Sequence, residues 1–218
     1  MRLKRVKKQF MVDLKKYFDK VYCINLDRRP DRYEKFTREM ARFGITDVER
    51  YSAIDGNTIA NDSPLLNGEL GILTTHMGIV QKSSEEGFKN VLILEDDVAF
   101  TEELHKLDEY MQSVPEDWDM IYFGGNHVYG KPPIKINDRV IKLNFTVAIH
   151  CVAIKNTLFE TIQAVLPHKK KAVDTYYAQL QNGYNAYGFY PNMATQSIGF
   201  SDIQNRVVDY NGFFQDIR

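Results

Sequence analysis

The alternation of strand-like and helical segments constrains the fold of this chain more than any other feature. Four segments rich in β-branched and aromatic residues predict strands: 21–25, 48–54, 91–94 and 120–123. Segments with helical patterning separate them: 30–43, 68–86 and 101–114. Strands that alternate with helices of this length pair mostly in parallel, because a parallel connection needs a long crossover. The sequence therefore predicts an α/β fold with a mixed, mainly parallel central sheet.

Helix-boundary residues support these assignments. Pro30 suits the first turn of a helix, Gly44 suits its carboxyl end, and Thr101 suits the position before a third helix. The second half of the chain has a less regular pattern. Its expected strands cover 139–143, 146–154 and 185–190, and its expected helices cover 156–165 and 173–182.

Positive charge is concentrated at the start of the chain. The net charge of −1 over 218 residues excludes an overall field that would favour nucleic acid. Residues 1–20, however, hold eight Lys or Arg and only two Asp. We therefore expect a basic N-terminal arm over 1–20 and a single domain over 21–218. The arm is either a solvated helix or a weak contact for a membrane surface or an anionic ligand.

Apolar runs and cysteines bear on the cellular compartment. Charged and polar residues interrupt every apolar stretch, so neither a secretory signal nor a membrane span of about 20 residues is predicted. Cys23 and Cys151 lie in apolar segments and lack a CxxC partner, which favours buried free thiols. A cytoplasmic location is expected.

Three consecutive carboxylates follow the apolar segment Leu92–Leu94. Glu95, Asp96 and Asp97 lie where a strand should end, and ligands of open α/β sheets bind beyond the carboxyl ends of the strands. Adjacent carboxylates repel one another, and Mg²⁺ or Mn²⁺ prefers oxygen ligands. Glu95 and Asp97 are two residues apart and point the same way on extended backbone. The turn therefore predicts a divalent metal held by Glu95 and Asp97; the alternative is a solvated acidic turn.

A set of ordered motifs resembles glycosyltransferase family 25, which includes lipooligosaccharide and procollagen galactosyltransferases. The motifs are Asn25–Arg32, Ala53–Gly56, Gly68–His76, Leu92–Val98, Ala172–Asp174, Tyr190–Gln196 and Ser201–Ile203. Their consistent order makes the resemblance specific. The sequence departs from the family pattern at four positions: Thr75, Val80, Val152 and Ala172.

The resemblance implies a GT-A type nucleotide-sugar-binding fold and an inverting hexosyltransferase. The donor would be a UDP-sugar of galactose or glucose type, the cofactor Mn²⁺ or Mg²⁺, and the acceptor a hydroxyl of a glycan or hydroxylated peptide. Asp174 and Asp96 would be the catalytic carboxylates. The residues expected to bind the donor are Asn25, Leu26, Arg28, Arg32, Asp55, Gly56, His76, His150 and Gln196.

The residues themselves leave several alternatives open. Asp174 precedes an expected helix, so it is either a general base or an N-cap. His76 falls on the apolar side of its helix, and both it and His150 are either core histidines or site residues. Two other functions also fit the acidic turn: a metal-dependent phosphate-ester hydrolase, and a catalytically silent module that binds a nucleotide-sugar or carbohydrate.

Overall fold

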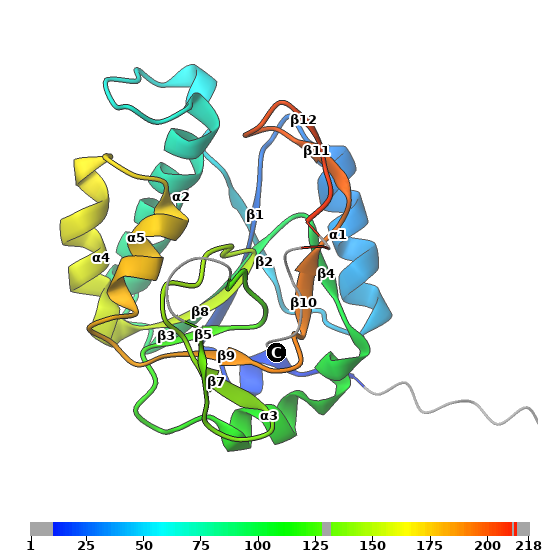
Figure 1. Ribbon diagram of the computed structural model, residues 1–218. Helices are drawn as coiled ribbons and strands as arrows, with labels where there is room; N and C mark the ends of the chain where they lie inside the picture. Colours follow the sequence, from blue (N-terminus) through cyan, green and yellow to red (C-terminus); the bar gives the residue numbers. More distant parts are fainter. Residues whose placement is uncertain (1–10, 128–131, 211, 213–218) are drawn as a thin grey trace, which may run out of the picture.

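A mixed eight-stranded sheet forms the centre of the computed structural model, which describes residues 11–127, 132–210 and 212 (Figure 1). Its strand order is β2-β1-β3-β8-β5-β9-β7-β6. These strands are β1 (Lys20–Asn25), β2 (Glu49–Ser52), β3 (Asn90–Glu95), β5 (Met120–Tyr122), β6 (Ile134–Lys135), β7 (Val140–Lys142), β8 (Cys151–Lys155) and β9 (Ala186–Phe189). The helices are α1 (Pro30–Arg42), α2 (Asn67–Glu85), α3 (Leu107–Ser113), α4 (Phe159–Val165) and α5 (Val173–Leu180).

Parallel pairing is confined to part of the sheet. Strand β1 pairs in parallel with β2 and β3, and β5 pairs in parallel with β9. Strand β8 lies antiparallel between β3 and β5, and β7 lies antiparallel to β6 and β9. Strands β6 and β7 are joined by a short loop instead of a crossover helix, which allows their antiparallel pairing. The α/β class and the mixed sheet are confirmed. The parallel pairs are β1 with β2, β1 with β3, and β5 with β9, and the other pairs of the central sheet are antiparallel.

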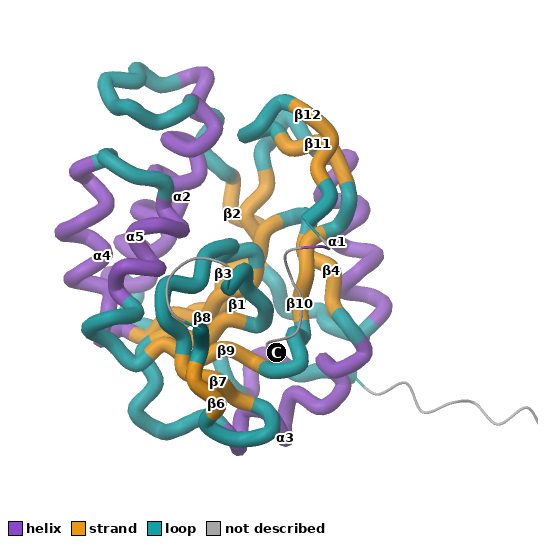
Figure 2. Tube along the Cα trace, in the orientation of Figure 1, coloured by secondary structure: helices purple, strands orange, loops and turns teal. Residues whose placement is uncertain are grey.

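Two small sheets lie outside the central one and were not expected from the sequence. Strand β4 (Val98–Phe100) pairs with β10 (Ala194–Gln196), and β11 (Gly199–Ser201) forms a hairpin with β12 (Arg206–Val208). Strand β4 begins directly after the acidic turn, so the turn is held between two strands. The hairpin lies beside α1 and across from α2 (Figure 2).

The expected strand over 146–154 forms only in its second part. Strand β8 begins at Cys151, whereas Val147 makes a single bridge to Asn126 and Ala148 adopts a positive φ of 70°. A left-handed residue interrupts the pleat, because a strand requires extended backbone throughout. Residues 146–150 therefore form a loop.

The helix boundaries follow the sequence signals. Helix α1 begins at Pro30, and Gly44 just beyond its end has the left-handed φ of 67°. The Thr101 hydroxyl accepts a hydrogen bond from the Glu103 N–H, as expected of a cap. The segment after Thr101 begins as a 3-10 turn and becomes α3 only at Leu107.

Helices cover both faces of the sheet, and the side chains of β3 show how. Leu92 and Leu94 belong to the core cluster that contains residues of α1 and α3, whereas Val91 and Ile93 belong to the cluster with residues of α2, α4 and α5. This alternation is the period of two that a strand imposes. Cys23 and Cys151 are buried free thiols, as expected.

The packed domain begins earlier than the expected boundary at residue 20. Val12, Leu14 and Phe18 are buried in the core, and the Val12 N–H donates to the Phe43 carbonyl at 3.0 Å. Residues 11–20 are therefore part of the domain, because their apolar side chains contribute to its core; the rest of the expected arm, 1–10, lies outside the described residues. None of the described helices is long and apolar enough to cross a bilayer.

Candidate functional site

A cleft of about 610 Å³ opens at the carboxyl ends of β1 and β3. Strands β1 and β3 are parallel neighbours with Ile24 opposite Glu95, so Asn25 and the acidic turn emerge at the same edge of the sheet. Eleven of the residues expected at the site line this cleft: Asn25, Leu26, Arg28, Arg32, Asp55, Gly56, Glu95, Asp96, Asp97, Asp174 and Gln196. Further acids line it as well, Glu69 and Asp202.

Arg32 compensates part of the charge of the acidic turn. Its Nε donates to Asp96 Oδ1 at 2.7 Å, and its Nη2 is paired with Asp97 Oδ2 at 3.0 Å. The Asn25 side-chain amide donates to the other oxygen of Asp96 at 2.7 Å. Both oxygens of Asp96, which we expected to be catalytic, thus accept hydrogen bonds that orient Arg32 and Asn25. The sequence alone predicted a metal as the compensating charge, because no local pattern indicates that Arg32 reaches the turn.

The charged groups of this cluster shift one another's pKa values. Burial alone would lower the pKa of Arg32, but Asp97 and Asp96 outweigh it and raise that pKa. Burial raises the pKa of Asp96, against the opposing effects of Arg32 and Asn25. Burial, followed by the charge of Asp97, raises the pKa of Glu95 from 4.5 to about 8. One guanidinium therefore does not balance three carboxylates, and the cluster favours additional positive charge.

The free oxygens of the turn fit a divalent cation. Among the described residues, Asp97 Oδ1 is buried without a hydrogen-bond partner, and Glu95 Oε2 has a long contact of 3.3 Å with the Gln196 amide. Within the described ranges, no group of three or more His, Cys, Asp or Glu side chains forms a ready metal cage. Mg²⁺ is commonly held by one or two carboxylates, with substrate phosphates and water completing its shell. Glu95 and Asp97 suit that mode of binding.

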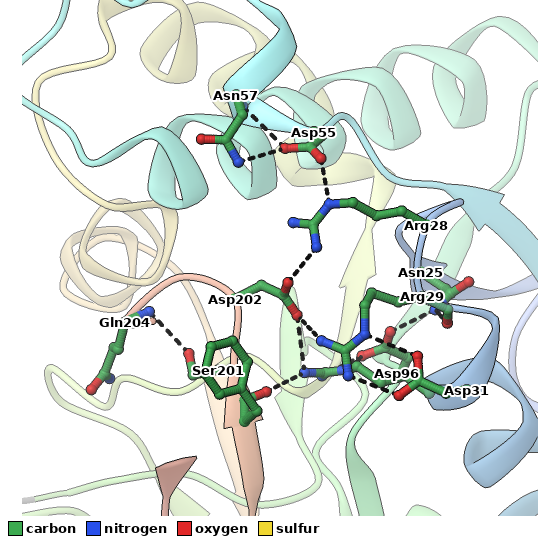
Figure 3. Close-up of polar contacts among 12 residues, drawn as sticks. Asn25, Arg28, Arg29, Asp31, Asp55, Asn57, Asp96, Ser201, Asp202 and Gln204 are labelled. Atoms are coloured by element: carbon green, nitrogen blue, oxygen red, sulfur yellow. Dashed lines mark hydrogen bonds and ion pairs between the residues drawn. The ribbon is translucent and has the colours of Figure 1, made fainter. Parts of the chain in front are cut away.

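Three arginines converge on Asp202, a residue to which the sequence argument assigned no role (Figure 3). Arg28 Nη1 donates to Asp202 Oδ1 at 2.6 Å, and Arg29 Nη1 donates to Oδ2. Arg32 Nη1 lies 3.9 Å from Oδ2. Asp202 is 174 positions from Arg28, and the only sequence signal was its place in the motif Ser201–Ile203.

Asp174 lies on another wall of the cleft. Helix α5 begins at Val173 with Ala172 as its N-cap, so Asp174 lies inside the first turn. The hypothesis that Asp174 is the N-cap is therefore wrong by two positions. Burial raises the pKa of Asp174, while backbone hydrogen bonds from Thr175 and Ala148 act in the opposite direction. A carboxyl whose pKa is raised toward neutrality accepts a proton more readily, as a general base must.

The two histidines do not line the cleft. His76 and His150 have no exposed surface. His76 Nδ1 is hydrogen-bonded to the Tyr177 hydroxyl at 3.0 Å, and burial lowers its pKa to about 3. Burial lowers the pKa of His150 to about 4, and its carbonyl accepts the Glu95 N–H at 2.9 Å. The structure thus places both in the core, because the apolar face of α2 points inward and His150, the residue just before β8, is buried.

A buried amide holds the loop before β8. Gln181 Oε1 accepts the Thr146 N–H at 2.7 Å, and Gln181 Nε2 donates to the Thr146 carbonyl at 2.7 Å. Phe145 and Ala148 on either side have positive φ values of 60° and 70° and line the cleft. Such backbone is strained for residues other than glycine, so it persists only where the surroundings impose it. Gln181 supplies that constraint.

The fold and this site define an α/β domain with an acidic, arginine-containing cleft at the carboxyl ends of its parallel strands. The chain belongs to glycosyltransferase family 25: the model of that family, described as "Glycosyltransferase family 25 (LPS biosynthesis protein)", matches residues 18–176. The resemblance of the sequence motifs to this family is thereby confirmed.

Several curated relatives carry family names. The chain is 28% identical to procollagen galactosyltransferase 2 of Mus musculus, over 62% of this chain and 26% of the relative. It is 30% identical to procollagen galactosyltransferase 1 of Danio rerio, over 58% of this chain and 24% of the relative. It is also 30% identical to "Inactive glycosyltransferase 25 family member 3" of Homo sapiens, over 51% of this chain and 22% of the relative. The match spans about a quarter of the length of these proteins.

Solved structures show a weaker similarity. A Drosophila β-1,4-galactosyltransferase 7 mutant, in complex with manganese, UDP-Gal and xylobiose, has a TM-score of 0.42 and 8% identity. The similarity covers 87% of this chain and 74% of that chain.

Proposed function

We propose that this domain is a GT-A type, metal-dependent hexosyltransferase that uses a UDP-sugar and inverts the anomeric carbon. The observation that carries the proposal is the convergence of the acidic turn, Arg28 and Arg32, and Asp174 around one cleft. The sugar is of galactose or glucose type, and the acceptor is a hydroxyl of a glycan or hydroxylated peptide. Membership in family 25 and the names of the procollagen galactosyltransferases support this assignment.

The charge of the cleft supports a role for a divalent cation in donor binding. Of the residues that the structure describes, seven carboxylates line the cleft, namely Asp55, Glu69, Glu95, Asp96, Asp97, Asp174 and Asp202, against the two guanidinium groups of Arg28 and Arg32. A diphosphate would be repelled from such a surface unless positive charge were added. Glu95 and Asp97 would hold Mn²⁺ or Mg²⁺, and the bound ion would supply Lewis-acid stabilisation of the diphosphate leaving group.

Asp174 is the proposed general base. It lies on α5, outside the acidic turn, so its carboxylate is not committed to the arginine–carboxylate network around Arg32. An inverting transfer requires the acceptor hydroxyl to attack from the side opposite the leaving group, and a carboxylate on that side can remove the hydroxyl proton. Asp96 would act by orienting Asn25 and Arg32.

A second candidate is a silent module that binds a nucleotide-sugar without turning it over. The inactive human relative, at 30% identity, is the specific observation in its favour. The acidic turn and Asp174 are all present in this chain, which supports turnover.

The experiment that tests the proposal measures release of UDP from a panel of UDP-sugars with Mn²⁺, with and without candidate acceptors. Release that an acceptor stimulates supports the transferase. Release that no acceptor stimulates supports the phosphate-ester hydrolase, and binding of a UDP-sugar without release supports the silent module.

A further inference from the structure

The carboxylate of Asp202 occupies a position that suits a phosphate group. Arg28 and Arg29 donate directly to its two oxygens, with Arg32 at the edge of the same group. Its side chain is only 15% exposed, although it lines the cleft. Several guanidinium groups directed at one anion are the usual arrangement for binding phosphate.

Each arginine also has a carboxylate partner of its own. Arg28 Nε donates to Asp55 at 2.6 Å, Arg29 Nη2 is paired with Asp31 at 2.9 Å, and Arg32 Nε donates to Asp96 at 2.7 Å. These partners orient the guanidinium groups whether or not Asp202 is in place. Asp202 is therefore the shared anion of the group, and the arginines do not depend on it for their orientation.

Asp202 lies in the turn of a hairpin that is built as a separate small sheet. Strands β11 and β12 pair with each other, and neither belongs to the eight-stranded sheet. The three arginines hold the hairpin against the loop after β1 and the first turn of α1, with one more hydrogen bond from Arg32 to the Phe200 carbonyl at 3.1 Å. On the other side the hairpin touches α2 at Gly68, where an added Cβ would lie 2.7 Å from the Ile203 Cα.

We propose that Asp202 is an internal competitor for the anionic group of the donor: its carboxylate occupies the arginine site until a diphosphate replaces it. This inference rests on the proposed function and adds a regulatory residue to that site. Two anions cannot share the same N–H groups without strong repulsion. A phosphate oxygen that binds Arg28 and Arg29 must therefore displace the Asp202 carboxylate, and with it the hairpin turn.

Binding of UDP to the full chain tests the proposal. The variants are Asp202→Asn, which keeps the size of the side chain and removes its charge, and Asp202→Ser, which guards against an effect of the amide itself. The matched control is Glu34→Gln, because Glu34 also pairs with an arginine of α1, Arg38, but neither residue lines the cleft or contacts Asp202. Isothermal titration calorimetry with UDP and Mn²⁺ gives the dissociation constants, and thermal unfolding verifies that each variant folds.

Both Asp202 variants are expected to bind UDP about tenfold more tightly than the wild type, the equivalent of about 1.4 kcal/mol. The Glu34 variant should match the wild type within about twofold, because its ion pair is exposed and lies outside the cleft. Unchanged or weaker binding of UDP by both Asp202 variants overturns the proposed competition and leaves the proposed function standing.

Titration with inorganic pyrophosphate distinguishes failure of the competition from failure of the proposed function. If UDP binds no variant while pyrophosphate binds the Asp202 variants more tightly, the competition holds and the proposed function fails. If neither ligand binds, both fail.

Discussion

The replacement Gln181→Leu tests how the loop at the cleft is held. Gln181 is buried, and its amide satisfies both the N–H and the carbonyl of Thr146, a residue with no exposed surface. Leucine has a similar volume but no polar atoms, so both backbone groups of Thr146 would lose their partners. A buried polar group without a partner costs about 1–3 kcal/mol, so the two together cost about 2–6 kcal/mol of unfolding free energy.

The same replacement should alter the cleft. Phe145 and Ala148 keep positive φ values on either side of Thr146, and the Gln181 amide helps to impose that conformation. Without the amide the loop can shift, which moves the Ala148 N–H away from Asp174. We expect the KM for the acceptor to rise while the affinity for UDP stays close to that of the wild type, because the arginine site lies on other elements.

Urea unfolding followed by circular dichroism measures the free energy of unfolding, and initial rates over a range of acceptor concentrations measure the KM for the acceptor. The matched control is Gln179→Leu, which makes the same change at an exposed position of α5, two residues before Gln181. A loss of less than about 1 kcal/mol in Gln181→Leu, similar to that of the control, would falsify the argument, because a cost of 1–3 kcal/mol is expected for each unsatisfied group.

Three further predictions concern the carboxylates. Without added metal, the free energy of unfolding should fall as the pH rises from 4.5 to about 8, because folded Glu95 keeps a proton that the unfolded chain releases. The replacement Glu95→Gln should remove this contribution to the pH dependence, which is at most about 5 kcal/mol. Urea titrations over this pH range measure it, and parallel pH profiles for the two proteins would contradict the prediction. Excess EDTA and Asp97→Asn should each abolish release of UDP with a retained fold, and full activity in EDTA would rule out a required ion. Asp174→Asn should slow transfer roughly 10²–10⁴-fold with little change in donor binding, whereas transfer within tenfold of the wild type would assign the base to another residue.

Local patterns in the sequence determined the scaffold of the site. The apolar runs that became β1 and β3 predicted parallel strands, and so predicted that Asn25 and the acidic turn emerge at one edge. Pro30, Gly44 and Thr101 marked helix boundaries correctly, because capping depends on residues within one turn. The family motifs in the sequence predicted most of the residues that line the cleft.

The tertiary structure decided which charges compensate one another. Arg32 reaches Asp96 from 64 positions away, and Asp202 reaches Arg28 from 174 positions away. The burial of His76 and of Leu14 likewise depended on which elements pack against them. Periodicity and caps report on interactions between near neighbours in the chain, whereas ion pairs and burial depend on how distant segments meet. For that reason the sequence alone predicted a charged site but not the arginine–carboxylate network that organises it.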